Sequence, residues 1–91
     1  MSTTYRFTLF IAGQSPRSTR AVENLETMGR NDLEGDFELH VIDVVEDPAQ
    51  AEEQQIMATP TVIKVSPAPV RRVTGDLSDR EAVALALGLP R

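Results

Sequence analysis

Apolar and polar residues follow two periods along this chain, one typical of strands and one typical of helices. In residues 5–12 every second side chain is large and apolar, which predicts a strand. In residues 16–30 apolar residues recur every three or four positions after Ser15-Pro16, a strong helix start signal. The same rules predict strands over 37–45, 61–65 and 70–74, a short helix over 49–57 and a last helix from Ser78. This order is βαβαββα, with the first strand central and the second parallel to it.

Pro60 marks the junction between a predicted helix and a predicted strand in the middle of the chain. A helix has to end near Met57 and a β-branched strand has to begin near Thr61, because proline removes an amide donor and restricts the residue before it. This setting resembles the cis-proline of thioredoxin-like domains, which precedes an antiparallel strand. We therefore expect one α/β domain of thioredoxin-like βαβαββα type over residues 1–91.

Residues 82–89 fit two secondary structures. Large and small residues alternate there as in a strand, yet alanine and leucine are strong helix formers. The spacing of Ser78 and Glu81 predicts a capping box, which favours the helix. Two packings of this segment could differ by only a few kcal/mol.

Composition excludes several functions. The 91 residues contain no cysteine, so thiol redox chemistry and thiolate metal sites are excluded. A net charge of −5 makes a nucleic acid an unexpected partner. No long apolar run or basic leader is present, so we expect a soluble, cytoplasmic protein that does not enter a membrane.

The candidate catalytic groups do not form a set. Ser15 and Ser18 have the spacing of a thioredoxin C-x-x-C motif, but serine needs an activating base. The one histidine, His40, is expected on the second strand, exposed and away from this loop. Helix capping is the simpler role for Ser15, and the sequence predicts that the protein is not an enzyme and needs no cofactor.

The charged residues near the predicted second and fourth strands can have structural roles. The acidic residues of the 43–53 region span a strand end and a helix start, where capping and dipole effects suffice, so a cation site is a weak alternative: Asp43, Glu46, Asp47, Glu52 and Glu53. Arg71 and Arg72 should point to opposite faces of their strand. They either discourage edge pairing or contact a partner carboxylate, and we weigh the two equally.

Four segments together resemble the KaiB family of circadian clock proteins. The similarity runs from about Tyr5 to Leu89 in the family's order and spacing, and its segments cover residues 10–16, 41–44, 58–61 and 69–81. The resemblance implies a non-enzymatic regulatory protein that binds the ATPase KaiC. It also implies that the C-terminal half can refold between a self-associating ground state, a tetramer or dimer, and a thioredoxin-like monomer. KaiA or a SasA-type kinase is then expected as a co-partner or competitor.

The resemblance also indicates which residues contact partners and which bear on refolding. It places partner contacts at Arg20, Gln55, Ile56, Arg71 and Arg72. It gives the positions that bear on refolding as Pro60, Pro67, Pro69, Ala86 and Gly88, with slow X-Pro isomerisation as one way to make a switch slow. Ala86 and Gly88 stand where glycine and aspartate are common in cyanobacterial members, and Glu23 and Gln55 stand where lysine is common.

Two other classes share the expected fold. A SasA-type sensor domain would look similar, but no kinase or linker accompanies it here. A glutathione transferase-like domain would use a serine at a helix start and a cis-proline, but the helical substrate domain of such enzymes is absent.

Overall fold

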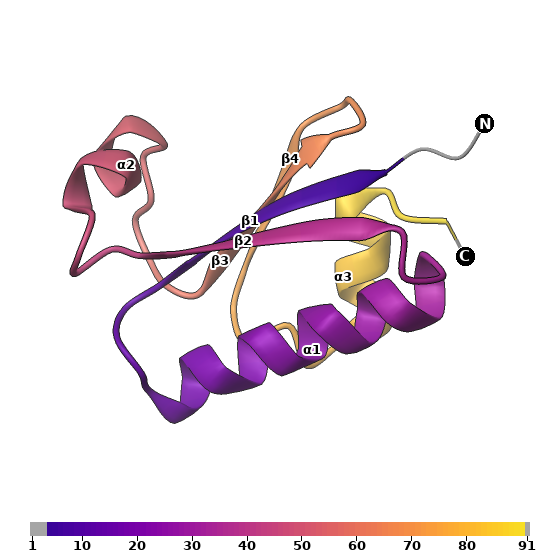
Figure 1. The fold of residues 1–91 in the computed structure, drawn as a ribbon, viewed down its shortest axis with the longest axis horizontal. Coiled ribbons are helices and arrows are strands. Elements are labelled where there is room, and N and C mark those ends of the chain that lie inside the picture. The colour runs from indigo at the N-terminus through magenta and orange to yellow at the C-terminus, as the bar shows by residue number, and fades with distance from the viewer. Residues whose placement is uncertain (1–3, 91) are drawn as a thin grey trace.

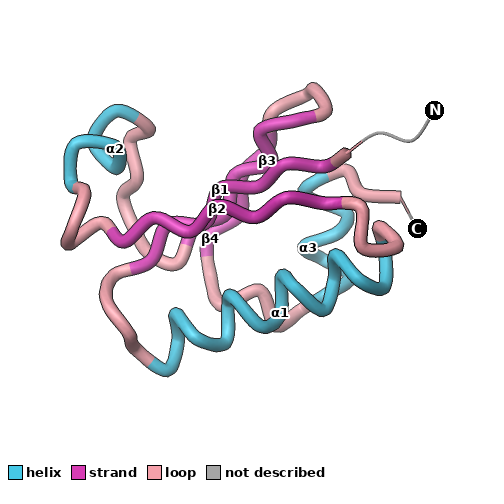
Figure 2. Tube along the Cα trace, in the orientation of Figure 1, coloured by secondary structure: helices cyan, strands magenta, loops and turns pink. Residues whose placement is uncertain are grey.

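The computed structural model describes residues 4–90. Figure 1 shows a twisted sheet with α1 and α3 below it and α2 at one end on the opposite side, and Figure 2 separates helices, strands and loops. The elements in chain order are β1 (Tyr5–Ile11), α1 (Pro16–Asp32), β2 (Phe37–Asp43), α2 (Pro48–Glu53), β3 (Thr61–Ser66), β4 (Arg71–Thr74) and α3 (Arg80–Leu87). The predicted order of elements is confirmed, with boundaries shifted by a few residues.

The sheet has the strand order β2-β1-β3-β4, so β1 lies in its interior as predicted. β2 runs parallel to β1, because α1 crosses over one face and returns the chain at the same end. β3 pairs antiparallel with β1, and β4 completes a hairpin with β3. The sheet therefore combines a parallel βαβ unit with an antiparallel hairpin.

Alternation along the strands divides the core into two parts. Phe7 and Leu9 of β1 face α1 and α3, where they pack with Leu25, Met28 and Leu87. Phe10 faces the other way and packs with Ile42, Ile63, Ala51 of α2 and Ile56, which follows that helix. The first cluster is much the larger, so α1 and α3 cover most of the buried apolar surface.

The start of α1 follows its sequence signals. The hydroxyl of Ser15 accepts a hydrogen bond from the Ser18 amide at 3.1 Å, and Pro16 is the first helical residue. The capping role predicted for Ser15 is confirmed. Near the other end, Gly29 allows the ring of Phe37 to lie directly against the helix backbone.

The predicted helix over 49–57 is too long, because α2 ends at Glu53. The amide of Gln55 donates to the Glu52 carbonyl at 3.0 Å, and that of Ile56 donates to the Ala51 carbonyl at 2.9 Å. Gln55 itself has a left-handed backbone with φ of 55°. This is a Schellman ending, in which Ile56 also packs with Ala51 in the smaller cluster.

The last segment is a helix, as local propensity predicted, but its cap differs from the prediction. The carboxylate of Asp79, rather than Ser78, caps α3 by accepting from the Ala82 amide at 3.2 Å. The Ser78 amide instead donates to the carboxylate of Asp76 at 3.1 Å, so the tight turn before the helix shifts the cap by one residue. Gly88 ends the helix with a left-handed backbone.

Three X-Pro bonds are cis, those before Pro60, Pro67 and Pro69. Pro60 is buried, and its carbonyl accepts a hydrogen bond from the Gly75 amide at 2.9 Å. This bond joins the start of β3 to the loop that leaves β4. Within residues 4–90, no helix is long and apolar enough to cross a membrane.

Candidate partner-binding surface

Arg72 joins the fourth strand to the end of α2. It lies opposite Ile63 in the β3–β4 register, which places it on the α2 side of the sheet. Its guanidinium Nη2 donates to the Gln54 carbonyl at 3.0 Å. The contact is exposed, so the remaining guanidinium donors can still reach a partner.

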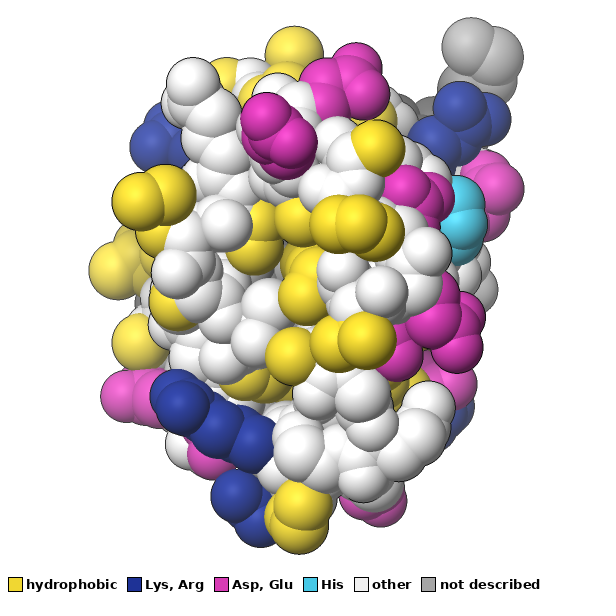
Figure 3. All heavy atoms as spheres, turned by 90° about the vertical axis from the view of Figure 1, so that its left-hand side faces the viewer, with side chains coloured by type: hydrophobic (Ala, Val, Ile, Leu, Met, Phe, Trp, Pro, Cys, Tyr) yellow, Lys and Arg dark blue, Asp and Glu magenta, His cyan; other side chains and the backbone are white. Residues whose placement is uncertain are grey.

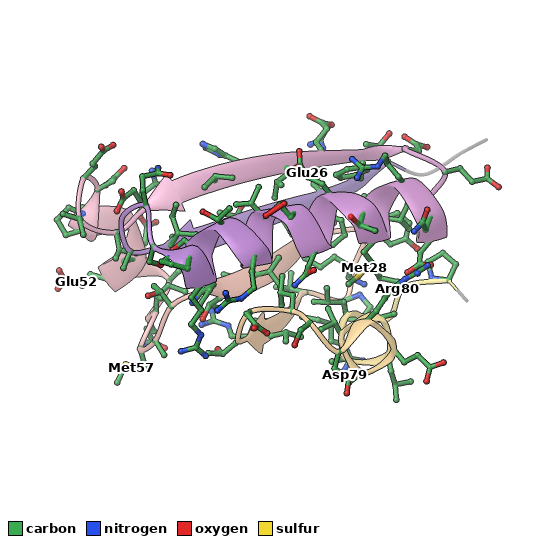
Figure 4. The ribbon with its side chains drawn as sticks, turned by 90° about the horizontal axis from the view of Figure 1, so that it is seen from below. Glu26, Met28, Glu52, Met57, Asp79 and Arg80 are labelled. Atoms are coloured by element: carbon green, nitrogen blue, oxygen red, sulfur yellow. The ribbon has the colours of Figure 1, made fainter. Side chains whose placement is uncertain are left out.

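Gln55, Ile56 and Met57 continue this surface. The left-handed turn at Gln55 directs the chain away from α2, and Ile56 is half-buried against the sheet. Met57 is 94% exposed and projects from the body of the protein in Figure 4. We call Gln55, Ile56, Met57 and Arg72 the α2–β4 surface.

The sequence did not single out Met57 as a surface residue, because the predicted helix extended to it. Because α2 ends at Glu53, the long apolar side chain of Met57 follows the turn and has no position in the core. Val45, in the loop before α2, is also 72% exposed. Figure 3, which views this end of the molecule, shows hydrophobic side chains spread over it, with basic side chains at the lower left.

The other two predicted contact residues lie apart from this surface. Arg71 is opposite Lys64 in the register and therefore on the α3 side, so the prediction that Arg71 and Arg72 point to opposite faces is confirmed. Arg20 belongs to α1, and its Nε lies 3.7 Å from the Asp76 carboxylate. Asp76 directly follows Gly75, whose amide donates a hydrogen bond to the Pro60 carbonyl.

Hydrogen bonds and nearby positive charges favour the ionised carboxylate of Asp76. Hydrogen bonds from the side chain and backbone of Ser78 lower the pKa of Asp76, and the nearby charges of Arg20 and Arg17 act in the same direction. On α3, the hydrogen bond and charge of Asp32 raise the pKa of Arg80. Both groups therefore stay ionised at neutral pH.

Two polar residues on the side of the sheet that α1 and α3 cover were not predicted from the sequence. Lys64 is only 2% exposed, and its ammonium lies 6.0 Å from the centre of the Tyr5 ring, within cation–π range. Its place in β3 is an inward position, which the alternation of Val62 and Lys64 along the strand could have indicated. Asn24 of α1, whose side-chain amide donates to the Asp76 carbonyl, had no signal beyond its helical position.

Among the candidate catalytic and metal residues, Ser15 and Asp43 make structural hydrogen bonds, whereas Glu46, Glu52 and Glu53 are exposed. Ser15 donates its hydroxyl hydrogen bond to Ser18 at 2.9 Å, and His40 is exposed on β2 as predicted. The Asp43 carboxylate accepts from the amides of Gly13 and Val45 at 3.1 and 2.9 Å. Among the residues that the structure describes, no group of three or more His, Cys, Asp or Glu side chains could hold a metal ion.

The fold matches several solved structures. The N-terminal domain of Synechococcus elongatus SasA aligns with a TM-score of 0.75 at 24% identity, covering 93% of this chain and 82% of that one. Mitochondrial thioredoxin 3 of Saccharomyces cerevisiae aligns with a TM-score of 0.72 at 17% identity, covering 94% and 78%. At these identities the likeness shows the fold alone, and it confirms the thioredoxin-like α/β class.

Sequence comparison is more specific. A family model for the KaiB domain matches residues 8–89. The circadian clock oscillator protein KaiB of Gloeothece citriformis is 49% identical over 86 residues, which cover 94% of this chain and 81% of the relative. The protein of the same description from Picosynechococcus is also 49% identical, with 94% and 83% covered. The chain therefore belongs to the KaiB family.

Proposed function

We propose that this protein is a clock or regulatory protein that binds a KaiC-type ATPase and modulates its phosphorylation or signalling cycle. The observation that carries this proposal is the 49% identity to circadian clock oscillator proteins KaiB over almost the whole chain. KaiB clock proteins are non-enzymatic, which agrees with the expectation from the sequence that this chain is not an enzyme.

The α2–β4 surface is the proposed centre of the contact, and Arg20 and Arg71 are proposed as further contacts that lie outside it. An exposed apolar side chain beside a guanidinium suits protein recognition, because arginine can bind a carboxylate in a bidentate manner. The Arg72 guanidinium is held by the Gln54 carbonyl before any partner arrives, which reduces the entropy lost on binding.

Binding can be tested with a cyanobacterial KaiC as the probe. Native mass spectrometry of the mixture with ATP, after prolonged incubation, should show a complex. The absence of a complex at micromolar concentrations would refute the proposal.

Arg72→Ala and Arg71→Ala form a matched pair, since the residues are adjacent but on opposite faces. Arg72→Ala should weaken binding by about 2–5 kcal/mol if the guanidinium pairs with a desolvated partner carboxylate. It should change the melting temperature little, because exposed polar contacts contribute about 0–1 kcal/mol. Arg71→Ala should weaken binding less. A sharp loss of stability with unchanged affinity would make Arg72 a structural residue.

We further propose that the C-terminal half refolds, and that the thioredoxin-like arrangement is the monomeric, ATPase-binding one. The alternation across residues 82–89 supports this, since a strand would gather Val83, Leu85 and Leu87 on one face for a subunit interface. Pro60, Pro67, Pro69, Ala86 and Gly88 are the positions proposed to set the balance. Strand-type NMR shifts across residues 83–87 that persist on dilution would contradict a thioredoxin-like resting monomer.

A SasA-type kinase is proposed as a competitor, and KaiA as a co-partner. The shared fold of this chain and the SasA N-terminal domain supports competition for one surface of the ATPase. An excess of the SasA domain should then displace this protein from KaiC, whereas a ternary complex would argue for separate surfaces.

A further inference from the structure

One stripe of side chains on α1 faces the segment that follows β4. Arg20, Asn24, Met28 and Asp32 recur every four residues, so they lie along one side of the helix. Figure 4 shows Met28 between α1 and α3, with Arg80 extending from α3 toward the C-terminal end of α1. Met28 is buried in the core that α3 covers, and the three polar members surround it.

Each polar member of this α1 stripe contacts the segment from Asp76 to Arg80. The Asn24 side-chain amide donates to the backbone carbonyl of Asp76 at 2.8 Å. Arg20 lies 3.7 Å from the carboxylate of the same residue. At the other end, Arg80 donates to the Asp32 carboxylate at 2.8 Å, and the Asp32 side chain is only 18% exposed.

The order of charges specifies one alignment. Along α1 the stripe is positive at Arg20 and negative at Asp32, while the facing segment is negative at Asp76 and positive at Arg80. A reversed segment would place like charges together, and a shifted one would leave the half-buried Asn24 amide without its acceptor. Apolar packing of α3 on Leu25 and Met28 would not by itself distinguish such alignments, because it is non-directional.

We infer that the α1 stripe selects the position of α3 and of the segment that leads into it, and that weakening the stripe frees α3 while the four-stranded sheet stays paired. Its polar contacts join α1 to residues 76–80 and lie outside the sheet, whose strands are held together by their own pairing. This inference goes beyond the proposed function, since it holds whether or not the chain binds an ATPase. Its test therefore uses the isolated protein.

Amide hydrogen exchange followed by NMR measures opening of α3 and of the sheet separately. Asn24→Ala removes one hydrogen bond, and Asn31→Ala is its matched control, because Asn31 is exposed on the same helix. Asn24→Ala should accelerate exchange in α3 about fivefold and leave β1 and β2 nearly unchanged, whereas the control should change neither. Equal acceleration in α3 and in the sheet, or none in either, would overturn the inference.

Charge reversal at the other end of the stripe provides a second readout. Asp32→Arg and Arg80→Asp each break the ion pair, and the double variant restores it with the charges exchanged. Each single change also improves the charge at its helix end, so the coupling between the two substitutions is the quantity to measure. Exchange in α3 of the double variant should be slower than the two single effects predict. Strict additivity would show that the pair does not position α3.

Discussion

Gly88 offers a direct test of how the last helix ends. It has φ of 70° and ψ of 34°, and its amide donates to the Leu85 carbonyl at 3.1 Å. Most residues other than glycine lose about 1 kcal/mol or more in this left-handed conformation. An added Cβ would meet only the Lys64 ammonium, at 3.6 Å, which is an ordinary contact. Gly88→Ala should therefore lower the free energy of unfolding by about 1 kcal/mol through its backbone alone.

The Lys64 ammonium makes the choice of side chain at position 88 informative. Asparagine and aspartate both tolerate the left-handed region better than alanine, and they have nearly the same shape. The helix dipole disfavours a carboxylate here by about 0.3–1 kcal/mol. A hydrogen bond between charged partners contributes about 1.5–3 kcal/mol, so attraction to the buried Lys64 should prevail. Gly88→Asp should thus be more stable than Gly88→Asn by about 1 kcal/mol.

Urea unfolding at pH 7 and low salt measures this series. The expected order of stability is glycine or aspartate first, asparagine next and alanine last, with an unchanged dependence on urea concentration. Added salt should narrow the gap between Gly88→Asp and Gly88→Asn. Equal stability of these two variants at every salt concentration would refute the charge interaction, and a neutral Gly88→Ala would refute the left-handed helix ending.

Three further predictions concern other elements. Asp79→Ala should lower the free energy of unfolding by about 0.5–2 kcal/mol through loss of the α3 cap, as measured by thermal melting, and an unchanged melting temperature would contradict the cap. Gly29→Ala should destabilise the fold despite better helix propensity, since a Cβ would lie 2.6 Å from Cζ of Phe37; a stabilised variant in urea unfolding would show that the ring moves freely. Because hydrogen bonds from Ser78 hold the pKa of Asp76 below its ordinary 3.8, the ionised carboxylate favours the folded state above that pH, and this contribution is lost as the pH falls through the lower folded value. Acid unfolding of Asp76→Asn should consequently lose less stability below pH 3.8 than the parent, and parallel curves would contradict this.

The strands and α1 could be predicted because their signals are local. Alternation placed Phe7 and Phe10 on opposite faces, and the structure buries them in separate clusters. Ser15-Pro16 marked the start of α1 correctly. These features depend on neighbours within one or two turns of chain, which a sequence displays directly.

The ends of α2 and the start of α3 were less predictable because competing local bonds decide them. Gln55 takes the left-handed position that glycine usually occupies, so the residue type at position 55 did not indicate where α2 ends. Ser78 and Asp79 are both good caps, and the hydrogen bonds between Ser78 and Asp76 leave Asp79 to cap the helix.

The candidate surface was predicted residue by residue, but not as an assembly. The register puts Arg72 beside α2 and Arg71 beside α3, and neither placement could be known before β3 and β4 were paired. The burial of Lys64 depends on the Tyr5 ring and on α3, which lie far from it in the sequence. Whether the five predicted contact residues bind a partner stays a prediction.

The central place of β1 has a consequence for how the chain folds as it is synthesised. Its first partner, β2, arrives after one helix, with Arg6 and Glu38 separated by 32 positions. Its second partner, β3, follows only after α2 and the loop to Pro60. The β1–α1–β2 unit can therefore close while the rest of the chain is still in the ribosome tunnel, leaving one edge of β1 open. The slow step should be the docking of the β3–β4 hairpin onto that edge, because pairing distant segments requires closing the longer loop.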